Sequence, residues 1–149
     1  MVAWLLGSVS LANPYGGGGL SIPSAAPEVA PFHWEVPERA VGSITLVLTV
    51  PKDHAVYQDA VAIEAVRGRI GEPVYPEARL APDPYEPGSW RASWSADVRV
   101  EVPVEAADAG VVELRLTHQG CRAGLCWPIE VSTHTVHVAL PVEERRESP

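Results

Sequence analysis

Apolar and polar residues alternate in four segments of the chain: 43–50, 97–104, 111–118 and 131–140. In the third segment, for example, Val112, Leu114 and Leu116 alternate with charged or hydroxyl-bearing residues. A two-residue period places successive side chains on opposite faces of a β-strand. We therefore predict four strands, each with one face in a hydrophobic core.

The segments between these strands carry weaker signals. Residues 56–66 favour another strand, but three alanines leave a helix as the alternative. Residues 67–88 are rich in Pro and Gly and predict irregular structure. Pro103 lacks a backbone N–H and faces away from the apolar side of its segment. We therefore expect strand 97–104 to end there or to form a sheet edge.

Several short strands at this spacing, without a sustained helical period, predict an all-β, antiparallel β-sandwich. A chain of 149 residues is long enough for one domain with a sizeable core. We place this domain at residues 32–141. Residues 13–31 include four successive glycines and predict a flexible linker, and residues 142–149 predict a charged tail.

Residues 1–12 form an apolar leader that ends in Ser10-Leu11-Ala12, similar to the hydrophobic region and cleavage site of a secretory signal. The basic region of such a signal is missing, because no Lys or Arg precedes Arg39. The alternatives are an apolar tail that is no signal, or a misassigned start site. Since a cysteine pair is typical of proteins outside the cytosol, we expect an exported protein.

Composition and motifs exclude several classes of function. The net charge of −8 and the scattered basic residues argue against a nucleic-acid-binding surface. No apolar run approaches the roughly 20 residues that span a bilayer. The motifs G-x-S-x-G and H-E-x-x-H and a phosphate-binding loop do not occur, so the sequence supports neither a hydrolase nor a nucleotide-binding protein.

The only two cysteines, Cys121 and Cys126, lie between the strands predicted at 111–118 and 131–140. A hairpin there would bring both sulfurs together at one end of a sheet. A structural disulfide is the usual role of such a pair in an exported domain. However, closing so short a loop should stabilise the fold by only about 2 kcal/mol, and a pair on a short loop also suits thiol–disulfide exchange. The residues alone leave both roles open.

The neighbours of the cysteines fit exchange chemistry or ordinary structure. Arg122 could favour a thiolate by its positive charge, or it is simply a solvated side chain. His118 could transfer a proton near pH 7, or it only ends a strand. Trp127 could cover one side of the pair, or it belongs to the core.

A metal site is a further alternative for the same residues. His118, Cys121, Cys126 and His134 form a Cys₂His₂ set of the kind that binds zinc or copper(I). The C-x₄-C spacing is loose for structural zinc, and His134 would have to reach the loop from the next strand.

The run from Gln119-Gly120-Cys121 to Cys126-Trp127-Pro128 resembles the Q-G-C…C-Y-P-P signature of the N-terminal domain of the periplasmic thiol:disulfide interchange protein DsbD. The resemblance covers residues 32–140, with Val102-Pro103-Val104 as a second matching motif. It implies an immunoglobulin-like antiparallel β-sandwich with an active-site hairpin and a cap loop. The chain departs from the signature at Trp127, at Ile129 in place of a second proline, and in a cysteine spacing one residue shorter than in some members.

The resemblance also implies a function. A domain of this family passes reducing equivalents from a membrane electron donor of the DsbD or CcdA type to thioredoxin-like periplasmic proteins. Cys121 and Cys126 would be the catalytic pair and would cycle between dithiol and disulfide, without another cofactor. Cys126 would form the mixed disulfide with the partner, and Cys121 would resolve it. We expect a periplasmic monomer, either a fragment of a longer membrane protein or a free-standing shuttle.

The family's cap loop carries acidic and aromatic residues, and the matching segment here is 83–88. The resemblance implies that Tyr85 is the cap aromatic, that Asp83 or Glu86 is its acidic neighbour, and that Tyr57 approaches the pair from an earlier strand. The alternatives are an ordinary loop tyrosine at Tyr85 and a core tyrosine at Tyr57. The alternative function is an immunoglobulin-like binding or assembly module with a structural disulfide or a Cys/His metal site.

Overall fold

The four alternating segments form the central strands of the fold. The computed structural model describes residues 29–141, so the predicted leader at 1–12, most of the linker and the tail at 142–149 lie outside the described residues. All four predicted strands are confirmed: β3 (Ser43–Thr49), β9 (Val98–Ala106), β10 (Val111–His118) and β13 (Glu130–Ala139).

The core consists of the apolar faces of these strands. In β9, Val98, Val100 and Val102 are completely buried, and the alternating residues of β3 and β10 are buried in the same way. Together with Trp34 and Trp94 they form one hydrophobic cluster. Burying each such aliphatic side chain stabilises the fold by roughly 1.5–3 kcal/mol, so the two-residue period is the main determinant of the fold.

Within the described range the strands form two sheets. The larger sheet has the strand order β5-β10-β13-β2-β3-β9-β6, with β1 also paired to β3, and the smaller has the order β12-β11-β4-β8-β7. The strands not yet given are β1 (His33–Glu35), β2 (Arg39–Val41), β4 (His54–Tyr57), β5 (Ala62–Arg67), β6 (Arg69–Ile70), β7 (Arg79–Pro82), β8 (Trp90–Trp94), β11 (Gly120–Arg122) and β12 (Leu125–Cys126).

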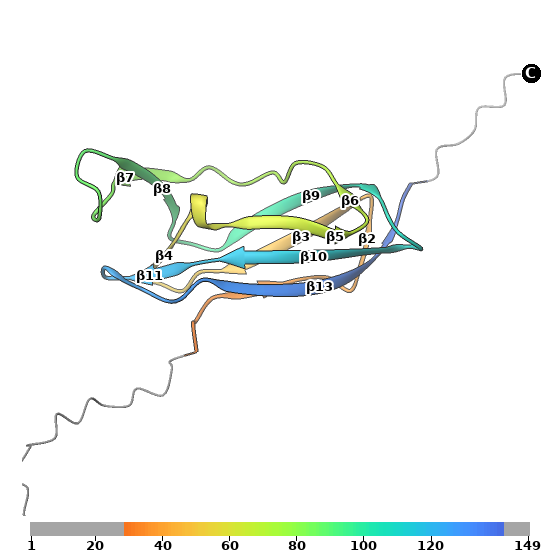
Figure 1. The fold of residues 1–149 in the computed structure, drawn as a ribbon, viewed down its shortest axis with the longest axis horizontal. Coiled ribbons are helices and arrows are strands. Elements are labelled where there is room, and N and C mark those ends of the chain that lie inside the picture. The colour runs from red at the N-terminus through yellow and green to blue at the C-terminus, as the bar shows by residue number, and fades with distance from the viewer. Residues whose placement is uncertain (1–28, 142–149) are drawn as a thin grey trace, which may run out of the picture.

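This arrangement confirms the predicted all-β, immunoglobulin-like β-sandwich. The pairing is antiparallel throughout the described residues except between β13 and β2, which run parallel. Figure 1 shows β4, β7, β8 and β11 together at one end of the molecule, away from the turn that joins β9 to β10. The smaller sheet therefore gathers the cysteine hairpin and the β7–β8 connection at one end of the sandwich.

Two predictions for the connecting segments were wrong. Residues 56–66 form neither one strand nor a helix, because a short 3₁₀ turn (Gln58–Ala60) separates β4 from β5. The segment 67–88 is not wholly irregular, because β6 and β7 pair with β9 and β8. These strands are too short to show a period in the sequence, and the pairing itself orders them.

Pro103 neither ends its strand nor lies at a sheet edge. β9 continues to Ala106, with β3 on one side and β6 on the other. The carbonyl of Pro103 accepts a hydrogen bond from the Gly71 N–H at 2.8 Å, and the Glu101 N–H is bonded to the carbonyl of Val74. Because its neighbours supply these bonds, the missing N–H of Pro103 interrupts the ladder without breaking it.

No helix of the described chain is long and apolar enough to cross a membrane.

A buried polar contact lies at the end of β10, next to the hairpin. The indole N–H of Trp34 donates a hydrogen bond to Nδ1 of His118 at 3.0 Å. Since an indole nitrogen can only donate, Nδ1 carries no proton, and the neutral ring holds its proton on Nε2. Nε2 lies 3.1 Å from a carboxylate oxygen of Glu130 but is not aligned for a hydrogen bond. Burial lowers the pKa of His118, and the nearby Glu130 only partly opposes this effect.

Because the pKa of His118 is lowered, we predict that the domain becomes less stable as the pH falls. Below the unfolded-state pKa, near 6.5, the unfolded chain takes up a proton that folded His118 resists. The free energy of unfolding should therefore decrease from pH 7 towards pH 5, by up to about 1.4 kcal/mol per pH unit from this group. His118→Gln keeps an acceptor for Trp34 and should flatten the slope, measured by urea unfolding across this range.

The matched control is His137→Gln, at an exposed position of β13. It should retain the wild-type slope. Identical slopes in the two variants would contradict the assignment to His118.

Candidate redox site

The two cysteines face each other across a tight hairpin. β11 and β12 pair with Cys121 opposite Cys126, and the two residues form a disulfide with Cα atoms 4.0 Å apart. The connecting residues, Ala123 and Gly124, have φ values of 47° and 81°. Two successive positive values are typical of a type I′ turn, whose twist matches the strands that it joins. The local turn therefore sets the register that places the sulfurs together.

The two cysteines differ in exposure. Cys121 is only 4% exposed, whereas Cys126 is exposed. Cys121 lies on β11, which is covered by its pairing with β4, whereas β12 is the edge strand of the smaller sheet. A second molecule can therefore approach Cys126 more readily than Cys121.

Close packing beneath the hairpin fixes its position. A Cβ atom added to Gly120 would lie only 2.0 Å from the ring of Phe32, so only glycine fits there. At the base of the hairpin, the Trp127 N–H donates a hydrogen bond to the Gly120 carbonyl at 2.9 Å. The side-chain amide of Gln119 donates to the Trp127 carbonyl at 3.1 Å. The glycine and glutamine next to Cys121 therefore both have structural roles.

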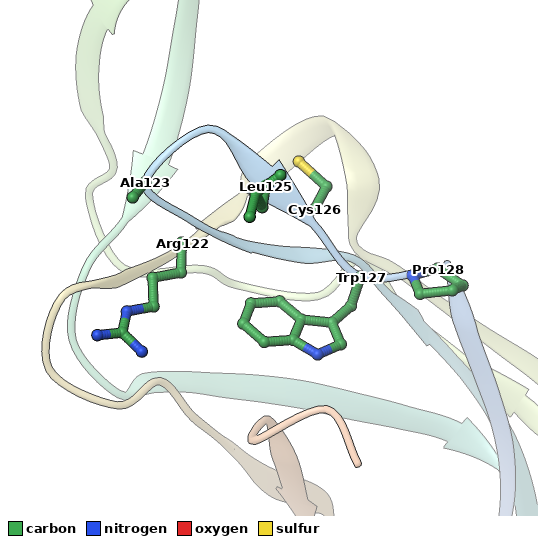
Figure 2. A pocket seen from close by; sticks show the side chains of 6 residues that line it. All are labelled: Arg122, Ala123, Leu125, Cys126, Trp127 and Pro128. Atoms are coloured by element: carbon green, nitrogen blue, oxygen red, sulfur yellow. The ribbon is translucent and has the colours of Figure 1, made fainter. Parts of the chain in front are cut away.

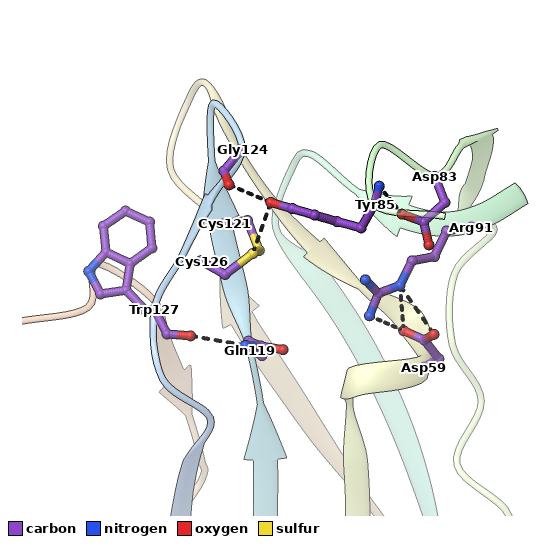
Figure 3. Close-up of a disulfide and its surroundings, with 9 residues drawn as sticks. All are labelled: Asp59, Asp83, Tyr85, Arg91, Gln119, Cys121, Gly124, Cys126 and Trp127. Carbon is purple, nitrogen blue, oxygen red and sulfur yellow. Dashed lines mark hydrogen bonds and ion pairs between the residues drawn. A yellow bond between two sulfur atoms is a disulfide. The ribbon is translucent and has the colours of Figure 1, made fainter. Parts of the chain in front are cut away.

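The connection from β7 to β8 covers the disulfide on one face (Figure 3). The Tyr85 hydroxyl donates a hydrogen bond to the Gly124 carbonyl and lies 3.7 Å from Cys126 Sγ. A carboxylate oxygen of Asp83 accepts the backbone N–H of Tyr85 at 2.8 Å, which orients the loop. Glu86 contributes its carbonyl, which accepts the Ser89 N–H at 3.1 Å. The hydroxyl end of Tyr85 thus lies next to the exposed sulfur (Figure 3).

Tyr57 lies under the same loop. The guanidinium carbon of Arg91 lies 3.7 Å from the centre of the Tyr57 ring, and Arg91 also makes a bidentate contact with Asp59, with distances of 2.9–3.2 Å. Burial raises the pKa of Tyr57; Arg91 opposes this, while Tyr85 and Asp83 raise it further. Tyr57 is therefore a neutral hydroxyl beside the cap.

The opposite face of the hairpin has a different character. Figure 2 shows Arg122 and Trp127 extending to one side of the hairpin and the Cys126 sulfur to the other. This side borders a cavity of about 530 Å³. Its lining residues are Arg122, Ala123, Leu125, Cys126, Trp127 and Pro128. Trp127 stacks on His54 with ring centres 5.4 Å apart, which ties this face to β4.

The structure separates the residues of the predicted site. Tyr85 and Cys126 are brought together, with Asp83 and Tyr57 beside them, whereas Arg122 and Trp127 lie on the other face. The contacts of His118 in the described chain are with Trp34, Phe32 and Glu130, inside the core.

The structure does not assemble the alternative metal site. The cysteines are joined in a disulfide, and His134 contacts the Ser132 hydroxyl at 2.8 Å. Among residues 29–141, no three His, Cys, Asp or Glu side chains are grouped as metal ligands.

Sequence reasoning missed Phe32, Arg91 and Asp59. Phe32 is the only phenylalanine of the chain, and it lies in the segment where the domain was expected to begin. Arg91 lies on β8, which no alternating pattern marks. The pairing of Arg91 with Asp59 joins residues 32 positions apart, so the sequence carries no local signal for it.

Fold and site together define a β-sandwich redox domain with a capped disulfide hairpin. The chain matches the family described as thiol:disulfide interchange protein DsbD, N-terminal, over residues 23–138. The chain therefore belongs to the family of DsbD N-terminal domains, whose redox group is a disulfide.

Two solved structures have the same fold. One is the reduced DsbD N-terminal domain of Neisseria meningitidis, with 20% identity and a TM-score of 0.62, covering 78% of this chain and 92% of that one. The other is a complex of the DsbD and PilB N-terminal domains from the same organism, with 18% identity and a TM-score of 0.62, covering 75% and 87%. The search of curated proteins found no match to this chain.

The contact between Gly120 and Phe32 predicts a specific sensitivity. Gly120→Ala forces a methyl group into the Phe32 ring and should destabilise the domain by about 1–3 kcal/mol, measured by urea unfolding. Phe32→Leu offers a smaller, more adaptable side chain at this position. The double variant should therefore be more stable than the sum of the two single effects predicts. Strict additivity would contradict this explanation of the glycine.

Proposed function

We propose that this domain passes reducing equivalents by thiol–disulfide exchange, from a membrane electron donor of the DsbD or CcdA type to thioredoxin-like periplasmic proteins. The observation that carries the proposal is the unequal exposure of the two cysteines on a capped hairpin. An exposed Cys126 can exchange with a second protein, while a buried Cys121 stays within reach to resolve the product.

The exchange takes place in two steps. In the reduced domain, the Cys126 thiolate attacks one sulfur of the partner's disulfide, and the partner's other sulfur leaves as a thiolate. Cys121, once deprotonated, then attacks Cys126 and releases the partner's first sulfur. Two thiols of the domain become one disulfide, and the partner's disulfide becomes two thiols. The membrane donor regenerates the dithiol by the reverse reaction.

The cap limits which molecules react. Tyr85 covers Cys126 but is itself 54% exposed, so the loop that carries it buries little surface. A loop with few buried contacts opens at low cost in free energy. A docking protein can displace it, whereas small oxidants meet the closed form for most of the time. This protection would preserve the dithiol in an oxidising compartment.

The family and one related complex support the partner class. The related structure holds a DsbD N-terminal domain together with the PilB N-terminal domain. We infer by analogy that this chain also docks a protein through its cysteine hairpin. The family further supports a periplasmic location.

Trapping tests the assigned roles of the cysteines. Cys121→Ala leaves Cys126 without a resolving thiol, so its mixed disulfide with an oxidised thioredoxin-like protein should accumulate. Cys126→Ala should trap at least tenfold less, because the remaining thiol is buried. The adducts are quantified on non-reducing gels. Equal trapping by both variants would contradict the assignment.

The reduction potential separates exchange from a structural bridge. Equilibration of the wild-type domain with a glutathione or dithiothreitol series should give a value of roughly −180 to −270 mV. A potential well below about −300 mV would instead favour the binding module with a structural disulfide.

Tyr85 is predicted to slow the reaction of the reduced pair with small disulfides. Tyr85→Ala removes the ring from Cys126 and should raise this rate about threefold to tenfold, measured by stopped-flow with a small aromatic disulfide. Tyr85→Phe keeps the ring but loses the hydrogen bond to Gly124, and it should give an intermediate rate. A Tyr85→Ala rate equal to wild type would show that the loop does not protect the pair.

A further inference from the structure

The face of the hairpin opposite the cap has two cavities and a charged side chain that the proposed exchange steps do not involve. The cavity behind Cys126 adjoins a second one of about 390 Å³. Arg122 and Trp127 line both cavities, so the two form one groove with these side chains at its centre. The second cavity is completed by Val29, Pro31 and His54.

The groove is apolar apart from Arg122 and His54. Leu125 at its edge is 76% exposed, and Ile129, which follows the lining residue Pro128, is 61% exposed. Apolar side chains gathered at this density on a surface are typical of interaction sites. Trp127 is held rigidly by its stacking on His54 and its edge contact with Phe32, so it offers a preformed wall.

The charge of this face differs from that of the rest of the domain. The protein as a whole has a net charge of −8, yet no Asp or Glu lines either cavity. In the described chain, Arg122 forms no ion pair, whereas Arg91 on the cap side is neutralised by Asp59. The cap loop thus carries the carboxylates of Asp83 and Glu86, whereas Arg122 is the only Asp, Glu, Lys or Arg residue that lines the two cavities.

We propose that this groove is the recognition subsite for the partner residues on either side of the reacting cysteine, and that it selects an apolar side chain before this cysteine and a carboxylate after it. The proposal rests on the exchange function proposed above and specifies its partner. Cys126 lines the groove, and its sulfur extends to the other side of the edge strand β12 (Figure 2). A segment lying in the groove can pass over this exposed edge, so that its own cysteine reaches the exchanging sulfur. The guanidinium of Arg122 meets the carboxylate, and Leu125 and Trp127 cover the apolar side chain.

The test uses symmetric disulfides of three capped peptides, acetyl-Leu-Cys-X-amide, in which X is Glu, Gln or Lys. The reduced domain converts each peptide disulfide to two thiols as its own pair is oxidised, and the rates are measured under pseudo-first-order conditions. Arg122→Glu should lower the Glu-to-Lys rate ratio about threefold to tenfold. Arg122→Gln should have about half of this effect on a logarithmic scale. High salt should reduce the preference of the wild type.

Arg39→Glu is the matched control. It makes the same change in net charge at an exposed position. Arg39 lines a different cavity together with Gly110, which belongs to the β9–β10 turn at the other end of the domain. It should leave the rate ratio unchanged. Equal changes in Arg39→Glu and Arg122→Glu, or no change in either, would overturn the proposal.

A second variant tests the apolar part of the groove. Leu125→Ser should slow all three peptides by a common factor of at least two, because it removes contact area and leaves the charge unaltered. Unchanged rates would overturn this part of the proposal. If the wild type reduces neither the peptides nor an oxidised thioredoxin-like protein, the exchange function itself fails. If it reduces the protein but none of the peptides, only the recognition subsite fails. If all three react without dependence on Arg122, only the recognition subsite fails.

Discussion

The contact between Phe32 and Gly120 is the constraint on which the site depends. The ring occupies the space that a side chain at Gly120 would need, so the strand of Cys121 lies directly on the core. Trp127 and His54 continue this packing on the same face. The hairpin therefore has a fixed side and a free side. The Cys126 sulfur lies on the free side, where the loop with Tyr85 covers it.

The arrangement of the sheets explains why the hairpin lies at the end of the sandwich. β10 ends at His118 in the larger sheet, and β11 begins two residues later in the smaller sheet, paired with β4. The chain returns through Glu130, opposite His118, to β13. The segment with both cysteines thus protrudes from a strand pair whose register the core determines. A disulfide held in this way can open and close while the buried strands stay in place.

The sequence predicted the parts of the fold that local patterns determine. Alternate residues are buried along β3, β10 and most of β9, and in β13 at Val136 and Val138, so the period is visible without knowledge of the partner strands. β7 and β8 were missed because their order comes from pairing with each other. The ion pair of Arg91 with Asp59 and the packing of Phe32 on Gly120 join residues far apart in the chain, so local sequence patterns do not reveal them. Only the family motif pointed to Asp83 and Tyr85, since a short polar loop has no period.

In the proposed exchange function, the two faces of the hairpin have different tasks. Small reactive disulfides must be kept from Cys126, and this requires a cover that opens at low cost, such as the exposed loop of Tyr85. A protein partner must also be oriented, and this requires a rigid surface, such as the packed face with Trp127. If one face had to perform both tasks, rigid packing would hold the cap closed. Because strand alternation places Cys126 and Trp127 on opposite faces, the cap can open without disturbing the surface that we propose orients the partner.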